Sequence, residues 1–338
     1  MADNPVLVEV TRGDMVESRH RGAAAVVDAD GRIIAAWGDV ERPVYARSSL
    51  KPLQTLPLIE SGAADRYQLT DADIALACAS HNGEPGHTER FGQWLQQVGL
   101  DVNDLECGSH IPMGDQAATE LACQHHGPSA LHNNCSGKHA GFLTTALHLG
   151  ESLQGYIDRD HPVQQRTRQV LAELSDTDLE QAPDGIDGCG IPVIGLSLRA
   201  TALAMARMAN PKALDPGRAA AARRIVQAMT DEPFMVAGSG RFDTVVMAVI
   251  GRQAAIKTGA EGFYTAMLPE AGLGIALKID DGATRAAETA IGALLIRYGA
   301  IGPAASQQLA DTLQPTLRNR VGRPVGLLRP AVDWLATV

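Results

Sequence analysis

Strand-like segments gather at the two ends of this 338-residue chain, and the residues between them follow a mainly helical pattern. Near the N-terminus, residues 5–10, 23–28 and 32–37 are apolar or β-branched, and Asp30-Gly31 is typical of a hairpin turn. Further strand-like segments come late in the chain, at residues 244–250, 254–256, 262–268 and 272–279. The pattern therefore predicts a β-rich lobe that both chain ends build together.

The central part of the chain predicts helices. Apolar side chains recur at helical spacing in residues 84–100, 196–208 and 216–229, and Asp215-Pro216 is a typical helix start. We therefore expect an α/β fold in which one domain has two interleaved lobes. Residues of about 1–69 and 236–338 form an α/β lobe with an antiparallel sheet, and residues of about 70–235 form an inserted, mainly helical lobe.

One Ser-x-x-Lys motif, Ser48-Ser49-Leu50-Lys51, lies where a helix is expected to begin and to run to Ser61-Gly62. Three residues of helix place Ser48 and Lys51 on the same face, within reach of each other. A serine hydroxyl becomes a nucleophile when a neighbouring base takes its proton, and a buried lysine can be that base. The alternative is a helix-capping serine followed by an unrelated lysine.

Two further motifs follow in order, Ser80-His81-Asn82 after a helical segment and Lys257-Thr258-Gly259 at a strand. Ser-x-x-Lys, Ser-x-Asn and Lys-Thr-Gly together form the motif set of penicillin-recognising serine enzymes. Lysine is scarce here, because 24 of the 29 basic residues are arginine, and the motifs use two of only five lysines. We therefore predict a fold like that of serine β-lactamases and penicillin-binding proteins, with Ser80 and Lys257 as a second serine–lysine pair.

Cysteine and histidine spacing is compatible with a metal site. Cys135 and His139 are four residues apart, and Asp187 and Cys189 offer a carboxylate and a second thiolate. Two thiolates and a nitrogen ligand suit a soft divalent ion such as zinc. The alternative is that these cysteines are small buried hydrophobic residues. Nearby, Arg241 and Asp243 have the spacing of a local ion pair.

At these residues the sequence resembles the Rhizobium etli-type, or class 3, L-asparaginases. The resemblance spans almost the whole chain and is strongest at residues 47–52, 80–84, 132–139, 187–190, 238–242 and 257–262. It implies a homodimer that hydrolyses L-asparagine to L-aspartate and ammonia. It also implies two catalytic pairs, Ser48 with Lys51 and Ser80 with Lys257.

The same resemblance implies a zinc ion close to the serines, held by Cys135, Lys138 and Cys189 with Asp187 nearby. It thus selects Lys138 where spacing alone favours His139. In the segments that carry the resemblance, we expect a group of polar and glycine residues to line the substrate pocket: Arg47, Asn82, Asp187, Ser239 and Gly240.

Charge and cysteine content narrow the cellular setting. The formal net charge is −10 and no run of basic residues interrupts it, which disfavours nucleic acid or an anionic membrane as a partner. Five cysteines, an odd number in a long chain, favour a reducing compartment. We see no secretory signal, and therefore expect a cytoplasmic protein.

Two other functions remain open from the sequence. A glutaminase, or an enzyme that hydrolyses β-lactams or peptides, could use the same three motifs. A zinc-dependent binding protein on a former enzyme scaffold would belong to a different class, and the intact serine–lysine pairs speak against it.

Overall fold

An eight-stranded antiparallel sheet joins the two ends of the chain, in the order β10-β11-β1-β2-β9-β8-β7 with β3 beside β2. The computed structural model describes residues 4–123, 125 and 127–337. The strands of this sheet are β1 (Val6–Arg12), β2 (Met15–Asp28), β3 (Ile33–Trp37), β7 (Ala255–Thr258), β8 (Phe263–Leu268), β9 (Leu273–Ile279), β10 (Thr316–Arg318) and β11 (Pro324–Pro330).

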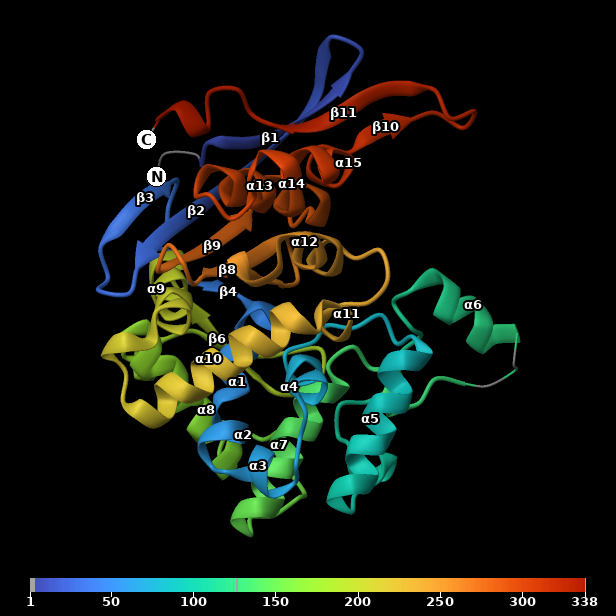
Figure 1. Ribbon diagram of the computed structural model, residues 1–338, viewed down its shortest axis with the longest axis vertical. Helices are drawn as coiled ribbons and strands as arrows, with labels where there is room; N and C mark the ends of the chain where they lie inside the picture. Colours follow the sequence, from blue (N-terminus) through green and yellow to red (C-terminus); the bar gives the residue numbers. More distant parts are fainter. Residues whose placement is uncertain (1–3, 124, 126, 338) are drawn as a thin grey trace.

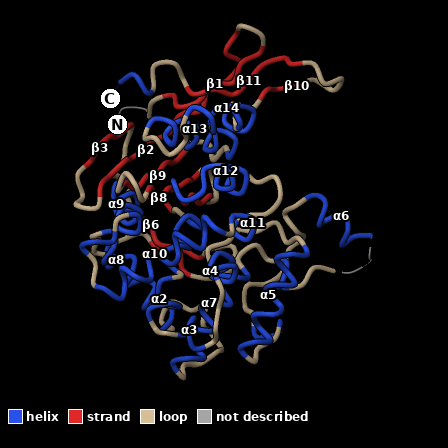
Figure 2. The backbone as a smooth tube through the Cα atoms, in the orientation of Figure 1, coloured by secondary structure: helices blue, strands red, loops and turns tan. Residues whose placement is uncertain are grey.

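The helices cover the sheet and form a second lobe beside it (Figures 1 and 2). Helices α13 and α9 both pack on β8 and β9, and Figure 1 shows them on opposite sides of the sheet. The α-helices are α1 (Lys51–Gln54), α2 (Leu56–Glu60), α3 (Ala63–Arg66), α4 (Asp71–Ala77), α5 (Pro85–Val98), α6 (Asp115–Cys123), α7 (Ser136–Leu149), α8 (Pro162–Ser175), α9 (Leu198–Ala209), α10 (Pro216–Asp231), α11 (Pro233–Val236), α12 (Phe242–Ile250), α13 (Thr284–Arg297), α14 (Pro303–Gln308) and α15 (Ala310–Leu313).

Short elements complete the description. A small antiparallel sheet has the order β4-β6-β5, and 3-10 turns connect several helices. These elements are β4 (Val44–Tyr45), β5 (Asp184–Ile186), β6 (Pro192–Leu196), η1 (Arg47–Leu50), η2 (Val102–Asp104), η3 (Ala130–His132), η4 (Leu179–Gln181), η5 (Pro211–Ala213), η6 (Gly251–Gln253) and η7 (Leu335–Thr337).

The predicted α/β architecture, with an antiparallel sheet from both chain ends and an inserted helical part, is confirmed. One helix departs from the expected division of the chain, because α9 falls within residues 70–235 and yet packs on β2, β8 and β9. The residues beyond 299, which suggested no function, add α14, α15 and the edge strands β10 and β11.

The strand predicted at residues 244–250 is wrong, because these residues belong to helix α12. Its buried side chains are Phe242, Asp243, Val246, Met247 and Ile250. They repeat at the helical spacing of three to four residues, so one face of the helix is buried. Because nearly all residues of this segment are apolar, the sequence shows no alternation of apolar and polar residues from which the helical period could be recognised.

The helix predicted from Ser48 or Ser49 to Ser61-Gly62 is divided into η1, α1 and α2. Pro52 and Pro57 each lie in the first turn of a short helix. A proline has no N–H to donate and favours the start of a helix over its interior, so two prolines five residues apart divide the segment.

Strand β7 and the η1 turn lie unusually close together, and this contact positions the candidate site. Gly259 follows β7, and a Cβ added there would lie 2.5 Å from the carbonyl oxygen of Ala46 and 2.8 Å from Ser49 Oγ. Only glycine permits this approach without displacing the chain. The Ser49 hydroxyl donates to the carbonyl oxygen of Lys257 over 3.0 Å, which fixes the two segments together.

Candidate active site

The η1 turn presents Ser48 at the start of the helical segment. Arg47 adopts a left-handed backbone conformation, with φ +53°, immediately before Ser48. Such a conformation is unusual for a residue other than glycine and is often found at functional sites. Ser48 is half-buried, and its hydroxyl makes no hydrogen bond that the structure records within the described part of the chain. It is therefore open to a bound molecule.

Ser80 connects two buried lysines. Ser80 follows α4, and its backbone N–H donates to the carbonyl oxygen of Val236 over 2.9 Å. Lys51 Nζ lies 3.1 Å from Ser80 Oγ, and Lys257 Nζ lies 3.0 Å from the same oxygen. The predicted contact between Ser80 and Lys257 is present. Lys51 was expected to pair with Ser48, and it donates instead to Ser80 and to the carbonyl oxygen of Ala79.

The environment of the two lysines favours proton exchange. Lys51 and Lys257 are almost fully buried, with 1% and 0% of their surface exposed. Burial lowers the pKa of Lys257 to about 7, although nearby Asp243 acts in the opposite direction. Burial, with a smaller effect of Lys138, also lowers the pKa of Lys51. Near neutral pH the Lys257 amine can therefore gain or lose a proton readily, and the lowered pKa of Lys51 makes its amine easier to deprotonate than that of an ordinary lysine.

A network of hydrogen bonds joins the Asn82 loop to the turn that contains Ser239. Asn82 Nδ2 donates to Glu84 Oε1 over 2.9 Å and to the carbonyl oxygen of Ser239 over 3.2 Å. Glu84 also accepts from the Ser239 N–H over 2.8 Å and from the Ser239 hydroxyl over 2.7 Å. These bonds lower the pKa of Glu84, against the effect of its partial burial.

Glycines shape the same turn. Gly238 has φ +113°, and a Cβ added there would lie 2.6 Å from Glu84 Oε1. Gly240, expected at the pocket, also has positive φ, at +70°. Arg241 follows and donates to Asn82 Oδ1 over 3.1 Å. The predicted pocket residues Asn82, Ser239 and Gly240 thus belong to one connected structure.

The second group of predicted residues surrounds two cysteines. Cys135, Lys138 and Cys189 are all buried, and Lys138 Nζ lies 3.0 Å from Cys189 Sγ. A hydrogen bond from Cys189 and the nearby Lys51 and Lys138 hold the pKa of Cys135 well below its usual range. Burial acts to lower the pKa of Lys138, but Cys189 and Cys135 raise it overall. The predicted zinc ligands therefore lie together.

Asp187 and Arg47 form an ion pair beside this group. Arg47 Nη2 lies 2.6 Å from Asp187 Oδ1, and Nε of the same guanidinium lies 2.7 Å from it. Burial acts to raise the pKa of Asp187, but Arg47 and Lys138 lower it overall. The pair therefore offers a positive and a negative charge side by side, and Arg47 directly precedes Ser48 in the sequence.

His139, which spacing favoured as a metal ligand, faces elsewhere. Its Nδ1 lies 2.8 Å from the Tyr156 hydroxyl, and its ring packs near Phe142 and Tyr156. The described residues contain no cluster of three or more His, Cys, Asp or Glu side chains that could hold a metal ion. A zinc ion at this place would therefore need the Lys138 amine as its third protein ligand. Two thiolates and one amine are a donor set that fits zinc.

Two acidic residues at the site were missed from the sequence. Glu84 supports Asn82 and Ser239, as described above. Asp243 accepts a hydrogen bond from the Thr258 N–H over 3.2 Å and another from the Tyr264 hydroxyl. The local ion pair expected between Arg241 and Asp243 is not what the structure has, because Arg241 bonds Asn82 and Asp243 bonds these two other residues.

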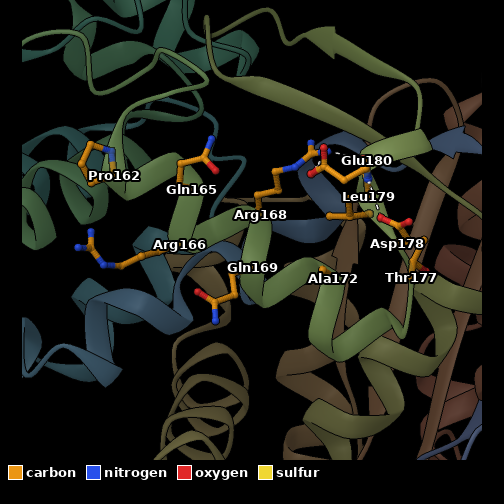
Figure 3. Close-up of a pocket in the computed structure, with 10 residues that line it drawn as sticks. All are labelled: Pro162, Gln165, Arg166, Arg168, Gln169, Ala172, Thr177, Asp178, Leu179 and Glu180. Atoms are coloured by element: carbon orange, nitrogen blue, oxygen red, sulfur yellow. Dashed lines mark hydrogen bonds and ion pairs between the residues drawn. The ribbon is translucent and has the colours of Figure 1, made fainter.

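A separate groove lies along α8 and η4, and Figure 3 shows its lining. Arg168 lies against the Leu179 carbonyl and the Glu180 carboxylate there. The residues that line it include none of the candidate active-site residues: Pro162, Gln165, Arg166, Arg168, Gln169, Ala172, Thr177, Asp178, Leu179 and Glu180. In the part of the chain that the structure describes, no helix is long and apolar enough to cross a membrane.

Comparison with known proteins gives one family. A family model described as L-asparaginase II matches residues 8–330. No curated protein sequence matches the chain at a significant level.

Several solved structures are similar at low sequence identity. A β-lactamase from Mycobacterium bovis is 15% identical, with a TM-score of 0.39 over 82% of this chain and 94% of its own. A putative β-lactamase from Bacteroides dorei is 13% identical, with a TM-score of 0.41 over 76% and 84%. A simvastatin synthase from Aspergillus terreus is 12% identical, with a TM-score of 0.32 over 82% and 93%. Similarities at this level say nothing about substrate or mechanism.

Proposed function

The chain belongs to the L-asparaginase II family, and from this premise we propose that it hydrolyses the side-chain amide of L-asparagine to L-aspartate and ammonia. Membership supports an amidohydrolase of the asparaginase type. The observation that carries the mechanism is the contact of Lys51 and Lys257 with a single hydroxyl, that of Ser80. Two buried amines joined by a serine can move a proton between them, which amide hydrolysis requires.

Ser48 is the proposed nucleophile. Its hydroxyl is half-buried and without a hydrogen-bond partner in the described structure, whereas the Ser80 hydroxyl is already engaged by both lysines. Ser48 Oγ attacks the amide carbon, and its proton passes to the neutral amine of Lys51, which must first turn from Ser80 towards Ser48. The carbon–nitrogen bond then breaks, and ammonia leaves with a proton supplied through Ser80 and Lys257. Water hydrolyses the resulting ester, which releases aspartate and restores the Ser48 hydroxyl.

The remaining predicted pocket residues suit a small zwitterion. Arg47, which directly precedes Ser48 in the sequence, and its ion-pair partner Asp187 carry opposite charges that match the carboxylate and ammonium groups of an amino acid. We further propose that Asn82, Ser239 and Gly240 form one wall of the substrate pocket, called the substrate wall below; Asn82 donates to the Ser239 carbonyl oxygen, and Ser80 donates to the carbonyl oxygen of Val236 just before this turn. We propose that this wall and the charged pair orient the side-chain amide towards Ser48.

A zinc ion is part of this proposal, with Cys135, Lys138 and Cys189 as its ligands. Their supporting features are their burial and the short Lys138–Cys189 contact. When bound, zinc would supply a positive charge that orients or polarises nearby groups. Binding requires the Cys189 thiol and the Lys138 ammonium to lose their protons, so it is expected to strengthen as pH rises.

We also propose that the protein is a cytoplasmic homodimer. The family resemblance supports the dimer. The five cysteines are all free in the structure, as expected for a reducing compartment. Light scattering of the purified protein tests the dimer, and a mass near 36 kDa instead of twice that value would refute it.

Ammonia release by purified protein tests the reaction. Wild-type protein is expected to act on asparagine, and Ser48→Ala is expected to lose at least about 10³-fold in kcat, as for removal of a serine nucleophile. Glutamine and a chromogenic β-lactam are assayed in parallel. Activity on either in place of asparagine would assign a different substrate, and substantial activity of Ser48→Ala would transfer the nucleophile to Ser80.

A further inference from the structure

The Lys257 amine is buried, and its position depends on the backbone of the residue that follows it. Lys257 is 0% exposed. Its amine donates to Ser80 Oγ over 3.0 Å and to the carbonyl oxygen of Thr258 over 2.8 Å. The position and direction of the amine therefore depend on how the Thr258 backbone is held.

The carboxylate of Asp243 holds the Thr258 backbone in place through its N–H. Asp243 lies in the first turn of α12 and is 1% exposed. Its Oδ2 accepts from the Thr258 N–H over 3.2 Å, and its Oδ1 accepts from the Tyr264 hydroxyl on β8. Both carboxylate oxygens are thus engaged, which fixes the side chain between α12 and the edge of the sheet.

We propose that Asp243 is a positioning residue for the reaction, which holds Lys257 against Ser80 and supplies the buried negative charge that keeps this amine protonated. The inference rests on the proposed function, because it assigns a reason for Lys257 to carry a proton that departing ammonia can take. A buried cation needs a counter-charge, and Asp243 is the carboxylate that acts on Lys257 most directly.

The other charged groups around Lys257 do not supply a second carboxylate. Lys51 of α1 and Arg241 before α12 are positive and act against protonation of Lys257. Cys135, before α7, acts in the same direction as Asp243 but more weakly, and Cys78 after α4 is kept neutral because burial raises its pKa to about 12. Asp243 thus outweighs Cys135 in maintaining the positive charge.

Glu288 on α13 provides a matched control. Its carboxyl group lies near Asp243, and burial together with Asp243 raises its pKa to about 7. It is not among the groups that act most strongly on Lys257, which are Asp243, Lys51, Arg241 and Cys135. The variant Glu288→Gln therefore removes a neighbouring carboxyl group while leaving the contact between Asp243 and Thr258 in place.

The small number of lysines makes a direct test feasible. Protein labelled with ¹³C at lysine Cε gives five signals by NMR, and the variant Lys257→Arg identifies the signal of Lys257. In wild-type protein this signal is expected to titrate near pH 7. In Asp243→Asn its midpoint is expected to fall by roughly one unit or more, as when an opposite charge is removed. In Glu288→Gln it should stay within about 0.3 units of the wild type.

Kinetics give the second readout. The variant Asp243→Asn is expected to lower kcat by roughly 10- to 100-fold at pH 8, within the range of general acid–base catalysis, with KM nearly unchanged. The alkaline side of its pH–rate profile should move to lower pH. A purely structural role of Asp243 would reduce the amount of folded protein without moving the midpoint or the profile.

The outcomes separate this inference from the proposed function. If Asp243→Asn folds and the Lys257 midpoint is unchanged, or if Glu288→Gln shifts it equally, the inference is overturned. If Asp243→Asn does not fold, Asp243→Ser, which keeps an acceptor for the Thr258 N–H, is judged by the same criteria. If wild-type protein releases no ammonia from asparagine, the proposed function fails, and the titration still decides whether Asp243 controls Lys257.

Discussion

Two buried lysines, Lys257 on the strand side of the site and Lys138 on the helix side, show opposite behaviour. Both lie almost entirely out of contact with solvent, at 0% and 3% exposure. Burial disfavours the charged form of each. The pKa of Lys257 nevertheless falls to about 7, whereas the pKa of Lys138 rises because Cys189 and Cys135 outweigh burial. Because both lysines are buried to a similar extent, the difference between their pKa values comes from the charged groups beside each of them.

This difference indicates a division of work. Lys257 lies next to the Ser80 hydroxyl, and burial, with smaller effects of Lys51 and Arg241, lowers its pKa enough for its proton to be removed near neutral pH. Lys138 lies against sulfur and stays charged until something competes for its lone pair, as a metal ion does. The strand side is thus suited to proton transfer and the helix side to ligand binding.

Replacing each lysine by methionine, which keeps much of the apolar volume, tests whether Lys257 serves proton transfer and Lys138 serves zinc binding. Lys257→Met is expected to lower kcat for asparagine by about 10³-fold, since it removes a general acid–base group. Its zinc content should equal that of the wild type. Ammonia release and metal analysis measure both quantities, and Lys212→Met, at an exposed lysine, is the control. Loss of zinc with activity retained would reverse the two roles.

The complementary variant, Lys138→Met, should weaken zinc binding by roughly 100-fold, because it removes one of three protein ligands. In the wild type, zinc affinity is expected to rise with pH, since the Lys138 ammonium must lose its proton before it can bind. In the variant this dependence should become less steep. Competition with a chelator between pH 6 and 8 measures both effects, and an affinity that does not respond to pH would contradict the assigned ligand.

Stability should reveal the same contrast. Lys257 has a folded pKa of about 7, below its unfolded value, so between these values the unfolded chain binds a proton that the folded protein has lost. The free energy of unfolding should therefore rise with pH from 7 towards 10, by at most about 1.4 kcal/mol per unit, and Lys257→Met should lack this gain. The raised pKa of Lys138 affects the free energy of unfolding only at pH values above the ordinary pKa of lysine, outside this interval. Urea titrations across this interval measure the slope, and equal slopes would refute the shift at Lys257.

The sequence predicted which residues belong to the candidate site better than it predicted which residues each of them contacts. Ser80 and Lys257 are 177 residues apart, yet their motifs predicted the contact that the structure has. Spacing alone selected His139 as a metal ligand, because four residues of helix separate it from Cys135. The helix start instead turns His139 towards Tyr156 and brings Lys138 to Cys189. Only the family resemblance selected Lys138.

The acidic residues were missed for a different reason. Glu84 bonds a turn 155 residues away, and Asp243 bonds residues 15 and 21 positions away on two strands. No short motif announces such partners, since a single acidic residue in a loop or helix is usually exposed. For Asp243 the error was compounded, because residues 244–250 predicted a strand and the helix that aims its carboxylate was not foreseen.

The weakest expected effect concerns the proposed substrate wall, where Glu84 accepts three hydrogen bonds from Asn82 and Ser239. Ser239→Ala removes only the bond from the Ser239 hydroxyl and leaves the turn attached through the backbone N–H. We expect KM for asparagine to rise by roughly 2- to 10-fold, the effect of one net hydrogen bond, with kcat little changed. Ser152→Ala, which removes two local hydrogen bonds to Gln154 on an exposed loop, is the control.

Glu84→Ala should raise KM further than Ser239→Ala, because it leaves all three donors without their acceptor, and Glu84→Gln should recover part of the loss. This order follows from the number of hydrogen bonds that each variant retains. If the variants lower kcat and leave KM unchanged, the wall acts on Ser80 and its two lysines and not on the substrate. It would then be wrong to assign substrate orientation to the wall and proton transfer to Lys257 on the strand side as separate roles.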